Sequence, residues 1–349
     1  MLPPTTRELD ACGIGFVADA HGRSSRAIVA GALGGLACVK HRGAVAADAR
    51  TADGSGMLVP IPPPLFGEGT GVAVLFVRGD DPRAAVEAAA GEEGVSVVDW
   101  REPPLDPAAL GDLARATAPR VIHAVFSGPA DVVATDSEAE RRALRLRRRI
   151  EATTVDTYLA SCSFRTMVYK GLAPADALAD YYLDLHDERF AAPFAVFHQR
   201  FSTNTLSTWE RAQPFRTLCH NGEINALWGN ENRMRGRAEL GTEAAGLGPE
   251  DLFTPVLDPD DSDSGKLDSA VELLMRAASG WEQPYFRLEG YRVTTYHRNA
   301  LRGGAPIEDG ASLVDTEASI EVWVGEERLV AIGEGNGPVN ALDAALRQV

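Results

Sequence analysis

Residues 12–16 read Cys-Gly-Ile-Gly-Phe and follow an eleven-residue leader. Their apolar side chains predict a buried strand, and Gly13 and Gly15 leave room for a ligand to approach Cys12 closely. If residues 1–11 are removed, Cys12 becomes a free N-terminus. Its thiol then acts as the nucleophile, and its own α-amino group, with an unperturbed pKa of about 7.7–8.0, accepts the proton. Since an isolated cysteine is more often a small buried hydrophobe, the residues around Cys12 decide its role.

Composition limits the class of protein. The chain has 349 residues, of which 45% are hydrophobic, enough for one large globular domain and a smaller one. Its net charge of −16 argues against a nucleic acid or an anionic membrane as partner. The leader lacks the pattern of a signal peptide and is a candidate propeptide, and no apolar run approaches membrane-spanning length.

The cysteines and histidines predict neither a metal site nor a cofactor site. Four cysteines, at positions 12, 38, 162 and 219, form no Cys-x-x-Cys pair, and the histidines show no ligand spacing. No glycine-rich loop suited to phosphate is present either. Free cysteines in a chain of this size indicate a reducing compartment, and we expect a cytoplasmic protein without a cofactor.

Short apolar runs alternate with helical spacings through the first 200 residues, which is typical of an α+β or α/β fold with a large sheet. The expected strands cover 14–17, 57–62, 72–77, 95–98, 121–127, 158–162, 166–168 and 195–200. The expected helices cover 28–36, 84–90, 110–116 and 138–150. The last helix is rich in arginine, which we interpret as a solvated surface face.

The densest polar chemistry follows the predicted strand 195–200, in residues 198–205 and 220–225. Asn221-Gly222 is ordinarily a turn, but it also offers a side-chain amide beside an exposed backbone N–H, the two donors of an oxyanion hole. Arg200 is either a surface ion-pair residue or a two-pronged ligand for a carboxylate. Asp263 lies in a short acidic turn, residues 261–264, which taken alone is a loop, a helix cap or a weak metal candidate. With a ligand that has a cationic end, Asp263 is a contact for an ammonium group.

These stretches together resemble the glutaminase domain of the glutamate synthase large subunit, a class II glutamine amidotransferase of the N-terminal-nucleophile kind. The resemblance is carried by DACGIGFVAD, KHRGAVAADARTADGSGM, FHQRFSTNTLSTWERAQPFRTLCHNGEINALWGNENRMR and SDSGKLDSAVELL, in the family's order. It covers about the first 275 residues. It implies an α+β fold, the αββα sandwich of the N-terminal-nucleophile hydrolases, over residues 12–275.

The resemblance also implies the roles of six residues. Cys12 is the processed nucleophile, and Asn221 and Gly222 form the oxyanion hole. Arg200 and Asp263 hold the α-carboxylate and α-amino groups of L-glutamine, and Arg42 is the family's other arginine at the site. The implied products are glutamate and ammonia, and in the family the ammonia passes to a synthase domain, which makes an ammonia-accepting synthase subunit a candidate partner.

Residues 276–349 depart from that family. Strands expected at 317–324 and 328–332 precede a helix at 339–347, which Pro338 and the glycines before it introduce. This βββα unit resembles half of the LeuA-type regulatory domain of 2-isopropylmalate and citramalate synthases, through Glu-Gly-Asn-Gly-Pro-Val-Asn-Ala-Leu. The departure predicts an incomplete glutaminase sandwich, and the unit's open sheet edge or apolar face predicts a homodimer.

Three hypotheses about function remain open at this point. The first is an enzyme that hydrolyses glutamine through Cys12. The second is a catalytically inactive fusion or remnant that acts as an interaction or regulatory module. The third is an amidase of the same superfamily with a different substrate, against which the pairing of Arg200 with Asp263 favours a free amino acid with two charged ends.

Overall fold

The computed structural model forms two compact units, Met1–Ser279 and Gly280–Val349, and each is described by itself. The residues described are 13–48, 50–128, 137–200, 206–222, 224, 228–234, 236, 257–258, 261–277, 287–299, 301–302, 305–306, 312–324, 327–335, 341–342, 344–345 and 348.

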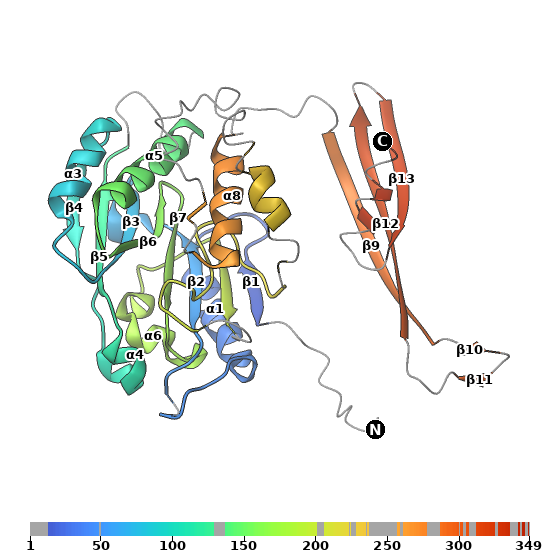
Figure 1. Cartoon of the computed structure of the whole chain (residues 1–349), viewed down its shortest axis with the longest axis horizontal. Coiled ribbons are helices and arrows are strands. Elements are labelled where there is room, and N and C mark those ends of the chain that lie inside the picture. The colour runs from blue at the N-terminus through green and yellow to red at the C-terminus, as the bar shows by residue number, and fades with distance from the viewer. Residues whose placement is uncertain are drawn as a thin grey trace. The chain divides into compact units, whose positions relative to one another are not determined.

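The first unit alternates strands and helices along the chain (Figure 1). Its strands are β1 (Ile14–Ala18), β2 (Ser55–Pro60), β3 (Gly71–Val77), β4 (Val97–Arg101), β5 (Arg120–Phe126), β6 (Thr157–Ser163), β7 (Thr166–Gly171) and β8 (Phe194–Gln199). Its helices are α1 (Arg26–Cys38), α2 (Pro63–Phe66), α3 (Arg83–Glu92), α4 (Asp112–Ala116), α5 (Ser137–Thr153), α6 (Leu178–Tyr181) and α8 (Asp263–Ala277). Every strand and helix expected from the first 200 residues overlaps one of these elements.

The strands form two antiparallel sheets of four, with orders β1-β8-β2-β7 and β4-β5-β3-β6. The consecutive strands β6 and β7 belong to different sheets, so the short turn between them links the two. In the first sheet, β8 lies between β1 and β2, with His198 opposite both Ile14 and Gly56. This register places the end of β8 beside the start of β1, where the conspicuous sequence at residue 12 begins.

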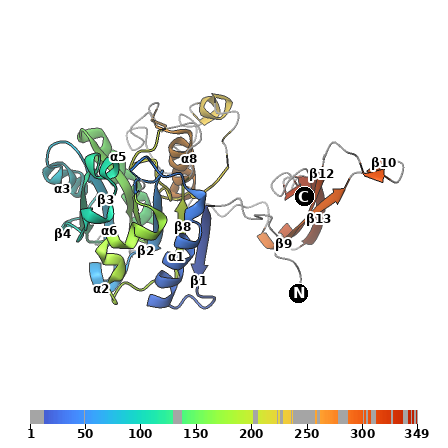
Figure 2. The same cartoon turned by 90° about the horizontal axis from the view of Figure 1, so that it is seen from below.

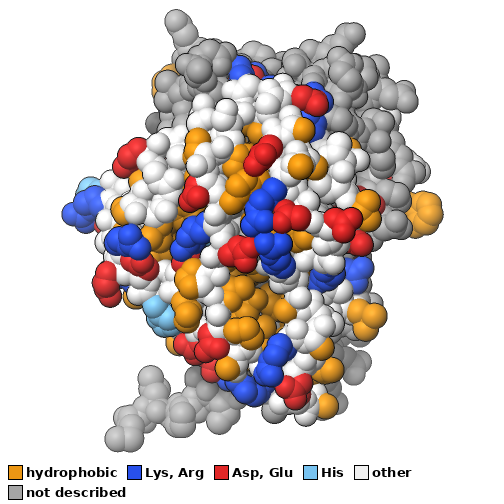
Figure 3. Space-filling view, turned by 90° about the vertical axis from the view of Figure 1, so that its left-hand side faces the viewer, with side chains coloured by type: hydrophobic (Ala, Val, Ile, Leu, Met, Phe, Trp, Pro, Cys, Tyr) orange, Lys and Arg blue, Asp and Glu red, His pale blue; other side chains and the backbone are white. Residues whose placement is uncertain are grey.

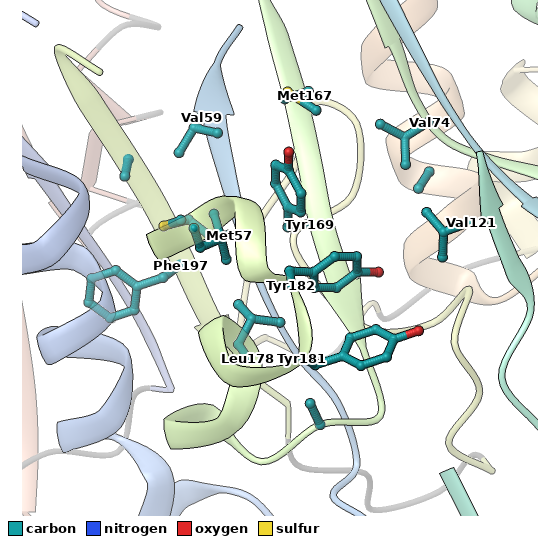
Figure 4. Close-up of a cluster of buried hydrophobic side chains, with 14 of the residues drawn as sticks. Met57, Val59, Val74, Val121, Met167, Tyr169, Leu178, Tyr181, Tyr182 and Phe197 are labelled. Carbon is teal, nitrogen blue, oxygen red and sulfur yellow. The ribbon is translucent and has the colours of Figure 1, made fainter. Parts of the chain in front are cut away.

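One large core is shared by both sheets. Met57, Met167 and Tyr169 of the first sheet belong to the same buried cluster as Val74 and Val121 of the second. Figure 4 shows Tyr169, Tyr181 and Tyr182 between the strands that carry these two groups. Aromatic rings meet there edge to face, for example those of Tyr169 and Tyr182 at 5.1 Å between centroids.

Helices cover the remaining faces. Helix α1 packs along β1 and β8 (Figure 2), where Gly35 makes room for the ring of Phe197. A second core lies between the β4-β5-β3-β6 sheet and helices α3 and α5, and includes Leu75, Ile122 and Leu146. On the face that carries α3 and β4, basic and acidic side chains are interspersed (Figure 3), as in the ion pair of Arg83 with Asp81.

The interpretation of helix 138–150 as a solvated face is wrong for its centre. The Arg147 side chain is only 2% exposed, and its Nη2 lies 2.7 Å from Oε2 of Glu272 on α8. Arg216 also reaches Glu272, at 3.2 Å, and Arg276 of α8 pairs with Glu140 of α5. Arg147 is buried because α8 packs on α5 and supplies the carboxylate of Glu272, a contact that the local charge pattern of one helix cannot reveal.

The second unit is a three-stranded antiparallel sheet of order β13-β12-β9. Its strands are β9 (Arg287–Asn299), β12 (Ser312–Val324) and β13 (Glu327–Gly335). Two further short strands, β10 (Leu301–Arg302) and β11 (Ala305–Pro306), form a separate hairpin. Of the expected helix 339–347, residues 341–342 and 344–345 are described and are helical, and the rest lies outside the described residues. Ala345 packs against Ile320 and Val322, and a Cβ on Gly333 would lie 2.2 Å from the backbone nitrogen of Ala345.

The coarse fold prediction is therefore confirmed: the chain is a mixed α and β protein with antiparallel sheets. Within the described residues, no helix is both long enough and apolar enough to cross a membrane.

Candidate functional site

The start of β1 is held at the end of β8. Cys12 itself lies outside the described residues, but Gly13 is described, and its carbonyl oxygen accepts a hydrogen bond of 2.6 Å from the backbone nitrogen of Gln199. A Cβ on Gly13 would lie 2.2 Å from the carbonyl oxygen of Gln199, so only glycine fits this approach. The residue that follows Cys12 is therefore fixed beside the last residue of β8.

Arg42 lies at the same place from another part of the chain. It ends the short 3-10 turn Lys40–Arg42 after α1, and its Cβ is 3.7 Å from where a Cβ on Gly13 would stand. The next residue, Gly43, packs so tightly on Gln199 that a Cβ there would lie 2.0 Å from Nε2 of Gln199. The structure thus brings Arg42 next to the segment that begins with Cys12.

The Asn221-Gly222 loop is tied to β8 by His198. Nε2 of His198 lies 2.7 Å from Oδ1 of Asn221 and 3.1 Å from the backbone oxygen of His220. Burial is the main cause that lowers the pKa of His198 to about 4, so its imidazole is neutral at pH 7. Because Asn221 binds through its carbonyl oxygen, the NH2 group of the same amide is left as the donor.

His220 connects this loop to the start of α8. Its Nδ1 lies 3.0 Å from the backbone oxygen of Gly222, and its Nε2 lies 3.0 Å from Oγ of Ser264. Ser264 in turn donates from its backbone nitrogen to Oδ1 of Asp263, the first residue of α8, at 2.7 Å. A chain of hydrogen bonds therefore runs from β8 through the Asn221-Gly222 loop to Asp263.

Arg200 follows β8 directly and is positioned by two polar neighbours. Its Nη1 donates to Oγ of Ser207 at 3.2 Å, and Ser207 donates to Oδ1 of Asp53 at 2.7 Å. Burial lowers the pKa of Arg200, and the carboxylates of Asp53 and Asp263 oppose that shift. The charge of Asp263 therefore acts on Arg200, although less strongly than that of Asp53.

Two of the other cysteines are poor nucleophiles. Burial raises the pKa of both Cys162 and Cys219 to about 12, which suppresses their thiolate forms at neutral pH. Among the described residues, no group of three or more histidine, cysteine and acidic side chains has the arrangement of a metal site.

Sequence reasoning missed the supporting residues. Nothing in the sequence pattern singles out Asp53, Ser207 or Ser264 as part of the site. The sequence places His198 and His220 in the two polar stretches without metal-ligand spacing, and it predicts no role for either. Their roles depend on contacts between residues 23 to 154 positions apart, which no local spacing reveals.

Comparison with known proteins identifies the family of the chain. Residues 12–285 match the family of Glutamine amidotransferases class-II. The chain belongs to this family. The match begins at Cys12 and contains every residue of the candidate site.

The amidotransferase region has relatives among glutamate synthases. The ferredoxin-dependent glutamate synthase of Oryza sativa subsp. japonica chloroplasts is 38% identical over 294 residues, which cover 77% of this chain and 18% of that protein. The NADPH glutamate synthase large chain of Bacillus subtilis is 39% identical over 294 residues, again 77% of this chain and 19% of the relative. The corresponding large chain of Azospirillum brasilense is 37% identical over 296 residues, with the same shares. This amidotransferase chain thus spans about a fifth of the length of these curated relatives.

A second match lies at the end of the chain. Residues 267–349 match the LeuA allosteric (dimerisation) domain. The two matched regions overlap over residues 267–285, so most of α8, which carries Asp263 as its first residue, lies in both.

Proposed function

We propose that this amidotransferase hydrolyses L-glutamine to glutamate and ammonia, with Cys12 as an N-terminal nucleophile after removal of residues 1–11. The main support for the proposal is that the predicted site residues, or their neighbours in the chain, meet at the end of β8. Gly13 is hydrogen-bonded to Gln199 through the backbone, and His198, which precedes Gln199 on β8, contacts Asn221. Arg200 follows at once and interacts with the charge of Asp263.

The proposed reaction begins when the α-amine of Cys12 takes the proton from its own thiol. The thiolate attacks the carboxamide carbon of glutamine, and the carbonyl oxygen becomes an oxyanion. The Asn221 side-chain NH2 and the Gly222 backbone N–H donate to that oxyanion, and each such donor contributes about 2.7–4 kcal/mol to lowering a barrier of this kind. The C–N bond then breaks, and the nitrogen leaves as ammonia with the proton held by the amine.

The thioester is hydrolysed in the second half of the reaction. Water attacks the acyl carbon, its proton passes to the amine, and the C–S bond breaks to release glutamate and restore the thiol. Throughout, Arg200 would pair with the α-carboxylate of the substrate and Asp263 with its α-ammonium group. Arg42, whose Cβ lies near Gly13, would contribute a second positive charge to the site.

We further propose that residues 12–275 form the αββα sandwich of the N-terminal-nucleophile hydrolases. The shared core of the two antiparallel sheets supports this, as do α1 on one sheet and α3 and α5 on the other. Residues 276–349 would then be a βββα unit resembling half of a LeuA-type domain. The ammonia acceptor would be a synthase subunit, as the glutamate synthase relatives suggest.

The second unit is proposed to join two copies of the chain. Val330 and Ile332 of β13 are 56% and 54% exposed, while Ala331 between them is buried, so the strand presents an apolar outer face. Changing Ile332→Asp should convert a dimer to a monomer in light-scattering measurements. A wild-type chain that is already monomeric at micromolar concentration would contradict this.

The proposed function is tested by intact mass before and after treatment with 6-diazo-5-oxo-norleucine, together with an assay for glutamate release. We expect loss of residues 1–11, one covalent adduct and hydrolysis of glutamine. Cys12→Ala should abolish the adduct and the activity, whereas Cys38→Ala, at an exposed cysteine, should retain both. An uncleaved, unlabelled chain would favour an inactive interaction module, and hydrolysis of another amide in preference to glutamine would favour a different amidase.

A further inference from the structure

His198 occupies a position that the proposed chemistry does not yet explain. It is only 2% exposed, and it lies on β8 opposite Ile14, two residues after Cys12. One ring nitrogen, Nε2, faces two oxygens, Oδ1 of Asn221 and the backbone oxygen of His220. The other, Nδ1, is buried and has no hydrogen-bond partner in the described part of the chain.

This environment assigns the tautomer. A backbone carbonyl only accepts hydrogen bonds, so Nε2 must carry the hydrogen in order to bind the oxygen of His220. The neutral ring then has no hydrogen on Nδ1, which agrees with the finding that no described residue accepts a hydrogen bond from that atom. Because Nε2 is a donor, the Asn221 atom that faces it must be the carbonyl oxygen rather than the NH2 group.

The orientation of the Asn221 amide decides whether Asn221 can serve in the proposed oxyanion hole. An asparagine amide can turn over and exchange its oxygen and nitrogen with little change in shape, and an exchanged Asn221 would present an acceptor to the oxyanion. We propose that His198 is a positioning residue that prevents this exchange, so that Asn221 presents its NH2 group to the substrate. This inference rests on the proposed function, because it gives His198 its role through Asn221.

A purely packing role fits His198 poorly. Burying an imidazole is costly unless its polar atoms are satisfied, and here the one satisfied atom contacts only the Asn221 loop. His123 offers a matched control. It is also a fully buried histidine on a strand, but neither of its ring nitrogens has a hydrogen-bond partner in the described residues.

The kinetic test compares two substitutions at His198 with one at His123. His198→Leu should lower kcat for glutamine about 10–100-fold with KM changed less than about twofold, since a misplaced oxyanion donor acts on the transition state. His198→Gln, whose Nε2 is an N–H donor at a similar reach, should recover most of the loss, and His123→Leu should leave kcat unchanged. In an Asn221→Ala background, His198→Leu should have no further effect.

Equal losses for His198→Gln and His198→Leu would overturn the proposal, as would additive losses in the double variant. Thermal unfolding of each variant identifies a loss of kcat that comes only from misfolding.

A spectroscopic test remains decisive even for an inactive enzyme. In protein with ¹⁵N-labelled histidine, long-range proton–nitrogen correlation distinguishes the two neutral tautomers, and the His198→Gln spectrum assigns the signals of His198. The Nε2–H tautomer supports the proposal, and the Nδ1–H tautomer overturns it. Wild-type protein that hydrolyses no glutamine but shows the Nε2–H tautomer would contradict the proposed function while leaving the orientation of Asn221 intact.

Discussion

The two four-stranded sheets differ in what their buried polar side chains do. In the first sheet, His198 and Gln199 end a strand and bind the loops that carry the candidate site. In the second, Ser163 binds Glu140 of the helix that covers the sheet, and His123 binds no described hydrogen-bond partner. Similar strand patterns thus have different roles, because the loops at the strand ends decide whether a buried polar group binds the loops of the candidate site or only a covering helix.

The largest expected effect tests whether the second sheet supports the site through α8. Arg216 is buried, pairs with Asp268 at 3.1 Å and Glu272 at 3.2 Å on α8, and lies against β6. Arg216→Met removes the arginine that pairs with the buried Asp268. Glu272 loses one ion pair and keeps those with Arg147 and Arg276. The free energy of unfolding should fall by about 3–5 kcal/mol in urea titrations, mainly because Asp268 stays buried without this arginine.

The control for this change is Arg189→Met, which removes an exposed ion pair with Asp187. It should leave the urea midpoint almost unchanged. Equal effects of the two substitutions would mean that the buried network does not anchor α8.

The next effect belongs to the first sheet. Asn221→Ala removes the proposed oxyanion donor without emptying a core, so kcat for glutamine should fall by about 10²–10³-fold. KM should change little and the unfolding midpoint should stay the same. If Asn221→Ala keeps the wild-type kcat, Asn221 has no part in the mechanism. The first sheet would then no longer differ from the second by its support of an oxyanion donor.

A smaller effect tests how closely α1 packs on the first sheet. A Cβ on Gly35 would lie 2.7 Å from the ring of Phe197, whereas a Cβ on Gly34, one residue earlier, meets nothing within 4 Å. Gly35→Ala should therefore destabilise the protein by about 1–3 kcal/mol in thermal or urea unfolding. Gly34→Ala should stabilise it by up to about 1 kcal/mol through helix propensity. If both substitutions stabilise the protein, the ring of Phe197 moves aside to make room for the new methyl group.

The smallest effect lies in the second sheet. Burial lowers the pKa of His123 to about 3, and its ring packs against Phe66 and Tyr169. His123→Phe removes two ring nitrogens that have no hydrogen-bond partner among the described residues. It should stabilise the protein by about 1–2 kcal/mol at pH 7, measured by urea unfolding.

The pH dependence of this variant has a definite sign. Between about pH 6.5 and pH 3 the unfolded chain binds a proton on His123 that the folded chain does not, so wild-type stability falls as the pH falls. The difference between His123→Phe and wild type should therefore widen by up to about 1.4 kcal/mol per pH unit below 6.5. If the difference in stability does not change with pH, His123 takes up its proton at the same pH in the folded and the unfolded protein.

Much of the local structure could be predicted from the sequence. Strands such as β3 and β5 and helices such as α1 and α3 follow from the spacing of apolar residues alone. Backbone geometry sets that spacing at 2 residues in a strand and 3.6 residues in a helix. The family could be predicted too, since the residues around Cys12, Arg200, Asn221 and Asp263 stand in a recognisable order. The roles of those residues and the domain limits remain predictions.

The sequence by itself therefore determined the elements, the family and a set of candidate chemical groups. Only the tertiary structure decided which groups meet: Gly13 with Gln199, His198 with Asn221, His220 with Ser264 and Arg147 with Glu272. The physical reason is that hydrogen bonds and ion pairs depend on distances of about 3 Å, and strand register and helix docking set those distances between residues far apart in the chain.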